Sequence, residues 1–250
     1  MSIRRFRLQF AAIALSFALS ACAGSSATLD NGYDDANDPY EGFNRKMFAV
    51  NMTLDKYALR PVANAYLKVP EPARISIRHF FDNLSSPITL ANDSLQGEWQ
   101  RASTTTARLV INTTVGILGL FDPASKWGFE KHKEDFGQTL GSYGVGEGVY
   151  IYLPVLGPSP PRDFIGFGVD NAIDPVNHIY DDNTSAAVGV YILKGVDARA
   201  TNMAIIDEIE RTSVDYYASV RSLYRQNRNS NIANGETDLD DLPDIDDLDE

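Results

Sequence analysis

The first 22 residues constrain the chain most, because they determine where it folds and which covalent bonds can hold it together. Arginines at positions 4, 5 and 7 precede an apolar run from Leu8 to Leu19, and small residues then lead to Cys22. This order is typical of an export signal, and the apolar run falls well short of the roughly 20 residues that a membrane-spanning helix needs. Cys22 is the only cysteine, so no disulfide can form within the chain. We therefore predict that residues 1–21 are removed and that non-covalent contacts alone stabilise the exported fold.

The residues around Cys22 resemble the lipobox at which bacterial lipoproteins are cleaved and acylated. The sequence Leu19-Ser-Ala-Cys22 places a thiol where a diacylglycerol would be attached, which implies lipidation of Cys22. An aspartate is absent after the cysteine, and in common lipoproteins this resembles an outer-membrane sorting signal. The alternative is an ordinary signal peptide with an accidental cysteine. We expect a stable lipid anchor on the periplasmic side of the outer membrane, with residues 22–36 as its tether.

Charge is distributed unevenly along the chain. The net charge is −12, and residues 236–250 hold nine acidic side chains and no basic one. Because so dense a run repels itself and buries no apolar surface, we predict a disordered acidic tail, with binding of a basic partner or a metal as the alternative. The remaining body is also acidic, which argues against nucleic acid as a partner. Residues 37–235 are expected to form the folded domain.

Apolar residues at helical spacing predict that this domain begins with helices. Asp38, Pro39 and Glu41 have the spacing of a capped helix start. An apolar stripe follows at positions 43, 47, 50, 54 and 57. We expect Arg60-Pro61 to break or kink this helix, and Pro70 to Pro72 to end its continuation. A second stripe at positions 77, 80, 81 and 84 predicts the next helix.

A further helix is predicted from Gln96 to Asn112, and its end runs into an uncharged stretch. Its inward positions are expected to be Ala102, Thr106, Leu109 and Val110. Residues 109–121 carry no charge, and they are too few to span a bilayer but enough to lie within one leaflet. On periodicity alone a buried core helix is favoured, and contact with lipid is the alternative.

The middle of the chain is rich in glycine. Positions 137, 141, 144, 146 and 148 are all glycine, which disfavours a rigid helix. We predict a short helix from Glu134, a flexible turn, and an extended segment that ends at Pro154. Asp163 lies near another helix start, and residues 184–227 are expected to be largely helical. The predicted fold class is mainly α, with at most a short β-hairpin.

Motifs of enzyme chemistry are absent from the sequence. It contains no Gly-x-Ser-x-Gly nucleophile elbow and no phosphate-binding loop. His132, with Glu134 and Asp135, offers too few nitrogen or sulfur ligands for a metal site. We predict no enzymatic activity, no metal and no cofactor, and a lipid-cleaving enzyme is the alternative.

Several short motifs, taken in order, resemble the VacJ/MlaA family of outer-membrane lipoproteins. They are Asp38-Pro-Tyr-Glu-Gly-Phe-Asn-Arg45, Arg60-Pro-Val62, Val69-Pro-Glu-Pro-Ala-Arg74, Phe136-Gly-Gln-Thr-Leu-Gly141, Tyr143-Gly-Val-Gly146 and Leu153-Pro-Val-Leu-Gly157. Each motif is weak alone, but their number and order extend the resemblance over residues 37–235.

The resemblance implies a ring-like, mainly helical protein that lies in one leaflet of the outer membrane. Phospholipids that have strayed into the outer leaflet would pass through its central channel to a soluble periplasmic carrier. Retrograde transport to the inner membrane would then maintain lipid asymmetry, without cofactor or bond cleavage. Members of the family are often found beside porin trimers. In a protein that lies in one leaflet, residues 109–121 are expected to touch lipid. The alternative function is a structural or assembly partner of porins that moves no lipid.

The resemblance also implies a role for the start of the first helix. Gly42, Phe43 and Asn44 match the family's N-terminal motif, and we expect them to hold that helix in the closed, selective arrangement of the channel. Packing of the helix start is the alternative.

A second group of residues implied by the resemblance is the glycine-rich loop. Gly144, Gly146 and Gly148 are expected to lie in a loop beside the channel, where glycine permits movement during lipid passage. Simple turn formation is the alternative.

Overall fold

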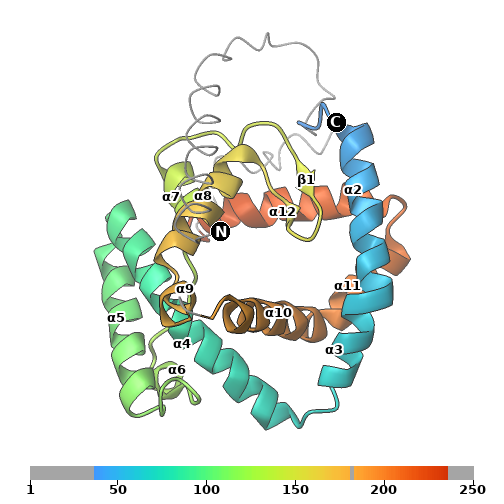
Figure 1. The fold of residues 1–250 in the computed structure, drawn as a ribbon. Helices are drawn as coiled ribbons and strands as arrows, with labels where there is room; N and C mark the ends of the chain where they lie inside the picture. Colours follow the sequence, from blue (N-terminus) through green and yellow to red (C-terminus); the bar gives the residue numbers. More distant parts are fainter. Residues whose placement is uncertain (1–36, 181–182, 236–250) are drawn as a thin grey trace, which may run out of the picture.

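A computed structural model describes residues 37–180 and 183–235, so Cys22, its tether and the acidic tail lie outside the described residues. Within these ranges the helices outline a ring, which the long helix Thr184–Thr201 crosses (Figure 1). The first half comprises α2 (Glu41–Leu54), the π-helical turn η1 (Asp55–Leu59), α3 (Arg60–Tyr66), α4 (Glu71–Gln96), α5 (Trp99–Thr114), α6 (Pro123–Lys126) and α7 (Phe136–Ser142). The second half comprises β1 (Tyr152–Leu153), β2 (Gly157–Pro158), α8 (Pro161–Ile173), α9 (Pro175–Ile179), α10 (Thr184–Thr201), α11 (Met203–Thr212) and α12 (Tyr216–Ile232). The predicted class, mainly α with one short antiparallel hairpin, is confirmed.

One side of the ring is a continuous helical rod made of α2, η1 and α3 (Figure 1). Of the break or kink expected at Arg60-Pro61, the break does not occur, because the helix widens into the π turn Asp55–Leu59 just before it. Proline lacks the N–H that would bond the carbonyl four residues back, and its ring crowds that carbonyl. A π turn relieves the conflict without ending the helix. The rod then stops at Tyr66, ahead of Pro70, as predicted.

The start of α2 differs from the predicted capped helix. The N-cap residue is Tyr40, which makes no side-chain cap, and Asp38 serves another purpose. The Asp38 carboxylate accepts hydrogen bonds from Asn44, from the Tyr217 hydroxyl and from Arg221. It therefore joins the first described residues to α12, the last helix of the described ranges.

The apolar stripe of α2 is also not its buried face. Buried positions are Asn44 and Phe48, and the exposed positions are Phe43, Val50, Leu54 and, in η1, Tyr57. The periodicity correctly predicts a helix, but most of its apolar stripe is not buried in the core: Phe43 and Val50 are exposed outside the lining of the largest described cavity, and Leu54 and Tyr57 line that cavity.

In helix α5, too, the residues predicted to face inward differ from the residues that are buried. It packs against α4 after a turn at Gly97, whose φ of 78° lies in the left-handed region that glycine favours. The predicted inward residues Thr106 and Val110 are exposed, and the buried face carries Thr105, Arg108 and Asn112 together with Ala102. Arg108 and Asn112 are buried because each donates a hydrogen bond to Asp122, at 2.8 and 2.9 Å.

The uncharged stretch that ends α5 is not a core helix, so the interpretation favoured by its periodicity is wrong. The helix stops at Thr114, and turns follow up to Phe121. Large apolar side chains stay exposed there: Val115, Ile117, Leu118, Leu120 and Phe121. Their exposure is the pattern expected of a surface that contacts lipid or another protein. Within the described ranges, no helix is both long enough and apolar enough to cross a membrane.

The apolar core is small and aromatic. Phe48, Tyr150, Tyr152 and Tyr217 are buried together, and their rings meet mostly edge to face. This cluster brings α2, the hairpin and α12 together. Because few apolar side chains are fully buried elsewhere in the described ranges, polar contacts must hold the other helices in place.

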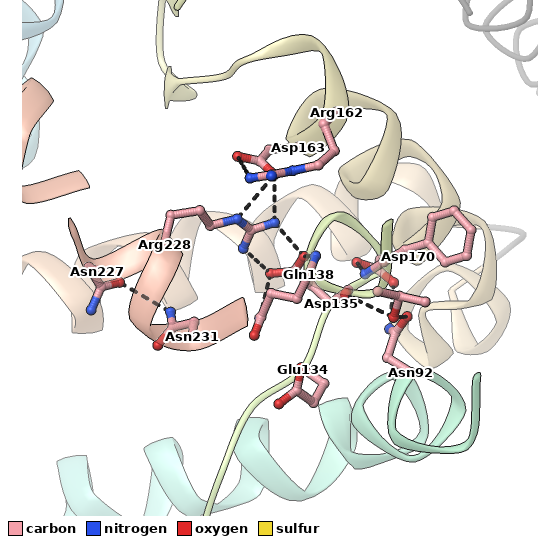
Figure 2. Close-up of polar contacts among 12 residues, drawn as sticks. Asn92, Glu134, Asp135, Gln138, Arg162, Asp163, Asp170, Asn227, Arg228 and Asn231 are labelled. Carbon is pink, nitrogen blue, oxygen red and sulfur yellow. Dashed lines mark hydrogen bonds and ion pairs between the residues drawn. The ribbon is translucent and has the colours of Figure 1, made fainter. Parts of the chain in front are cut away.

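Figure 2 shows one of these polar networks, in which Arg228 reaches from α12 between Asp135 and Asp163. Its guanidinium donates to both Asp135 oxygens at 2.6 and 2.7 Å and to Asp163 at 2.8 Å. Burial alone would raise the pKa of Asp135, but the hydrogen bonds from Arg228 hold it below its usual value. Asp135 also caps α7 by accepting from the Gln138 N–H at 2.9 Å. One arginine therefore fixes α7, α8 and α12 relative to one another.

Two glycines allow α7 and α8 to approach closely enough for this network. A Cβ on Gly166 would lie 2.3 Å from the Gly137 nitrogen, and a Cβ on Gly137 would lie 2.3 Å from Arg228 Nη2. Beside this contact, Asp170 accepts from the Phe136 N–H and from Asn92. Burial raises the pKa of Asp170 to about 6.

Replacing Arg228 by glutamine should lower the free energy of unfolding by about 3 kcal/mol, because two neighbouring carboxylates lose the cation that they share. Urea unfolding of the purified chain, followed by circular dichroism, measures the loss. The control is Arg211→Gln, which removes an exposed ion pair with Glu208 and should cost less than about 1 kcal/mol. Equal losses in the two variants would contradict the role given to Arg228.

Candidate functional site

A large open cavity of about 1070 Å³ lies within the ring, and it is the candidate site. Its walls come from the rod of α2, η1 and α3, from the hairpin, and from α10, α11 and α12. In Figure 1 these elements surround the space bounded by α2 and α3 on one side, α12 above and α10 below. The volume is at the upper end of the range for small-molecule sites, so the cavity can admit a ligand with long chains.

The lining of the cavity combines apolar side chains, called the apolar wall below, with charged side chains, called the charged wall. Apolar or aromatic residues include Phe48, Val155, Leu156, Ile192, Val196, Ile206, Tyr216 and Val220. The charged residues come from η1 and α3 and from α10 and α11: Asp55, Lys56, Arg60, Arg199 and Glu210. A molecule with an apolar body and an ionic group can therefore satisfy both walls at once.

The charged wall is organised by the π turn. Residues 51–60 all line the cavity, so the rod presents this whole segment to it. Asp55, the first residue of the turn, accepts from Arg199 Nε at 2.7 Å and from Arg199 Nη2 at 3.0 Å. These hydrogen bonds raise the pKa of Arg199 above its already high value, so its charge is permanent. Single π turns occur frequently at functional sites, because they re-aim side chains without ending a helix.

The hairpin that lines part of the cavity is held in place by two asparagines of α2. Asn44 donates to the Tyr150 carbonyl at 3.0 Å and accepts from the Tyr152 N–H at 2.9 Å. Asn51, two turns later, repeats the arrangement with the Leu153 carbonyl at 3.1 Å and the Val155 N–H at 2.7 Å. Each side-chain amide thus pairs with the backbone as a neighbouring strand would, and the hairpin is fixed along α2.

The tip of this hairpin is apolar and strained. Val155 has a φ of 69°, which is a rare conformation for a β-branched residue, and its side chain is 81 % exposed. The hydrogen bond from its N–H to Asn51 holds it there. Val155 and the half-exposed Leu156 therefore stand at the cavity as apolar side chains that the protein itself does not cover.

The residues of the N-terminal motif lie on different faces of α2. Asn44 is fully buried and joins Asp38, Tyr150 and Tyr152 as described above. Gly42 and Phe43 are exposed, and a Cβ on Gly42 would meet nothing within 4 Å. The motif residues do not line the cavity, so their role in holding the channel closed remains a prediction.

The glycine-rich loop lies beside the hairpin and also outside the cavity lining. Gly144 and Gly148 have φ values of 81° and 77°, which suit glycine, whereas Gly146 has an ordinary φ. Between them, Glu147 accepts from Asn37 at 3.1 Å and pairs with Arg225 at 3.0 Å. The first described residue and α12 are thereby tied to this loop, and its role in gating remains a prediction.

The charged wall of the cavity was not predictable from the sequence. Asp55 and Arg199 are 144 positions apart, so no local pattern could have paired them. The asparagine clamps were visible in principle, because Asn44, Phe48 and Asn51 have the i, i+4, i+7 spacing of one helical face. Asparagines at two positions of that helical face were the feature of the sequence that could have indicated the clamps.

Comparisons with known proteins agree on one family. The family model described as MlaA lipoprotein matches residues 36–231. The intermembrane phospholipid transport system lipoprotein MlaA of Escherichia coli is 36 % identical over 92 % of this chain and 90 % of its own length. The protein of the same name from Haemophilus influenzae is 34 % identical over 90 % of both chains. A solved structure, described as "Structural basis for maintenance of bacterial outer membrane lipid asymmetry", is similar with a TM-score of 0.70 and 36 % identity, over 78 % of this chain and 98 % of the other.

Proposed function

Because the chain belongs to the MlaA lipoprotein family, we propose that it removes mislocalised phospholipids from the outer leaflet of the outer membrane and passes them through its cavity. The observation that carries the proposal is the mixed lining of that cavity, which offers both apolar and charged side chains. Acyl chains lie against the apolar wall, which keeps them from water, and the ionic head group lies against the charged wall. The lipid needs no bond broken to move this way, so no enzymatic step is assigned to the chain.

The outward-facing apolar side chains support a position within one leaflet. On α5, Arg108 and Asn112 are buried while Trp99 and Val110 are exposed. The turns that follow expose five large apolar side chains: Val115, Ile117, Leu118, Leu120 and Phe121. Trp127 is exposed just after this region and has the amphipathic ring that membrane interfaces favour. The surface formed by Val110, Val115, Ile117, Leu118, Leu120, Phe121 and Trp127 is called the apolar edge below. We place it against lipid.

Anchoring and partners complete the proposed function. A lipid on Cys22 would hold the chain at the periplasmic face of the outer membrane, and residues 22–36 would tether it to Asn37. The family resemblance supports a soluble periplasmic carrier as the recipient of the lipid, and porin trimers as neighbours. The rival function, a porin partner that moves no lipid, would make no use of the cavity.

Filling the cavity distinguishes the two functions. Ala58 is exposed within the cavity lining, so Ala58→Trp should obstruct lipid passage without disturbing the core. In cells that lack the protein, exposed outer-leaflet phospholipid should rise. Wild type should restore the low level, and Ala58→Trp should lose most of that restoration. Ala49→Trp is the control, because Ala49 is also exposed but lies outside the lining. If Ala58→Trp restores the low level at normal abundance, transport through the cavity is excluded.

The position of the apolar edge can be measured with its own tryptophan. The sequence contains two tryptophans, so a Trp99→Phe variant leaves Trp127 as the single fluorophore. In vesicles whose acyl chains carry nitroxide groups, Trp127 fluorescence should be quenched strongly, because the ring contacts the hydrocarbon region. In a Trp127→Phe variant, Trp99 is the single fluorophore, and its quenching is the comparison. A water-soluble quencher is measured in parallel. If it quenches Trp127 as strongly as the nitroxide-labelled acyl chains do, the membrane contact is contradicted.

A further inference from the structure

Two arginines at the charged wall are joined by a single carboxylate. Arg60, the first residue of α3, donates through Nη2 to one Asp207 oxygen at 2.7 Å. Arg199 of α10 donates through Nη2 to the other Asp207 oxygen at 3.5 Å. Arg60 and Arg199 both line the cavity, whereas Asp207, on α11, is not part of the lining. The carboxylate thus bridges two guanidinium groups of the lining without belonging to the lining itself.

Both arginines keep donors that this bridge does not use. Arg199 is almost fully buried, and its Nη1 has no hydrogen-bond partner among the described residues. Arg60 is 40 % exposed, and Nη2 is the one guanidinium nitrogen whose hydrogen bond is found within residues 37–180 and 183–235. A buried donor without a partner is costly, and such groups in native structures are commonly explained by a ligand or water.

The chemistry of the ligand follows from the bridging geometry. A phosphodiester carries one negative charge over two equivalent oxygens, as a carboxylate does, and guanidinium groups bind both through paired N–H donors. Asp55 holds Arg199 in a fixed orientation with two further hydrogen bonds, so the site is preorganised. A phosphodiester at the charged wall can take the two arginines in the way that Asp207 takes them now.

We propose that Arg60 and Arg199 bind the phosphodiester of the transported lipid, and that Asp207 holds the same two side chains when no lipid is bound. This inference rests on the proposed function and names the group that recognises its substrate. Exchange between Asp207 and phosphate leaves neither arginine without a partner. The Arg60–Asp207 pair is partly exposed and therefore weak, so an incoming phosphate displaces the carboxylate easily. A site of this kind binds a lipid in transit and also releases it.

The proposal predicts opposite effects for the two members of one ion pair. Arg60→Gln removes a charge-assisted donor, so it should weaken binding of phosphatidylglycerol about tenfold. Asp207→Asn removes the internal competitor, so it should strengthen that binding several-fold. A purely structural ion pair would make the two variants behave alike. Arg60 is chosen over Arg199 because its loss leaves no buried carboxylate behind.

The measurement is equilibrium binding of fluorescent phosphatidylglycerol to the purified, lipidated chain in detergent micelles. Diacylglycerol with the same acyl chains is the phosphate-free comparison, and neither variant should change its binding. Arg211→Gln and Glu208→Gln, on the exposed surface of α11, are the controls with the same charge changes. The urea midpoint of each variant confirms that it is folded.

Several outcomes would overturn the proposal. Unchanged phosphatidylglycerol affinity in Arg60→Gln, or weaker affinity in Asp207→Asn, removes the assigned role while leaving transport through the cavity intact. Displacement of the bound lipid by millimolar inorganic phosphate at constant ionic strength would assign the arginines to free phosphate instead. If wild type binds neither lipid, the proposed function itself fails, and the failure is visible without any variant.

Discussion

The ring depends on charged side chains that join helices far apart in the sequence. Three arginines of the second half each bind an aspartate from an earlier element: Arg228 with Asp135, Arg199 with Asp55, and Arg221 with Asp38. These contacts are needed because the outward faces of several helices are apolar, which leaves little apolar surface for a central core. Breaking such a pair leaves a poorly solvated charge, so the closed arrangement is strongly preferred over partly open ones.

The use of ion pairs rather than a large apolar core to join the helices leaves room for the cavity. Where a water-soluble helical protein would fill its centre with leucine and valine, the described part of this chain keeps a space lined by both apolar and charged side chains. The charged wall exists because a π turn re-aims Asp55 toward Arg199, and the apolar wall because Asn44 and Asn51 fix the hairpin along α2. The same polar contacts that close the ring therefore create a path for an amphipathic molecule, which is the property that transport of a phospholipid requires.

Sequence reasoning predicted the helices well and their orientation poorly. Periodicity, prolines and glycines located α2, α4, α7 and the long helical region after residue 184. Of the four predicted inward residues of α5, Ala102 is buried, but Thr106 and Val110 are exposed, because hydrogen bonds from Arg108 and Asn112 to Asp122 turn a polar face inward. The charged wall could not be predicted, since it joins residues more than a hundred positions apart. The family was recognised from the order of short motifs along the chain, which requires no knowledge of contacts between distant residues.

The central claim is that phospholipid occupies the space inside the ring, and photo-crosslinking in living cells tests it most directly. A benzophenone amino acid in place of Tyr216, which lines the cavity, should yield an adduct with the mass of the chain plus one phospholipid. The same group in place of Tyr143, which is exposed but outside the lining, should yield little of it. Adducts of equal yield at both positions, or none at Tyr216, would contradict the account.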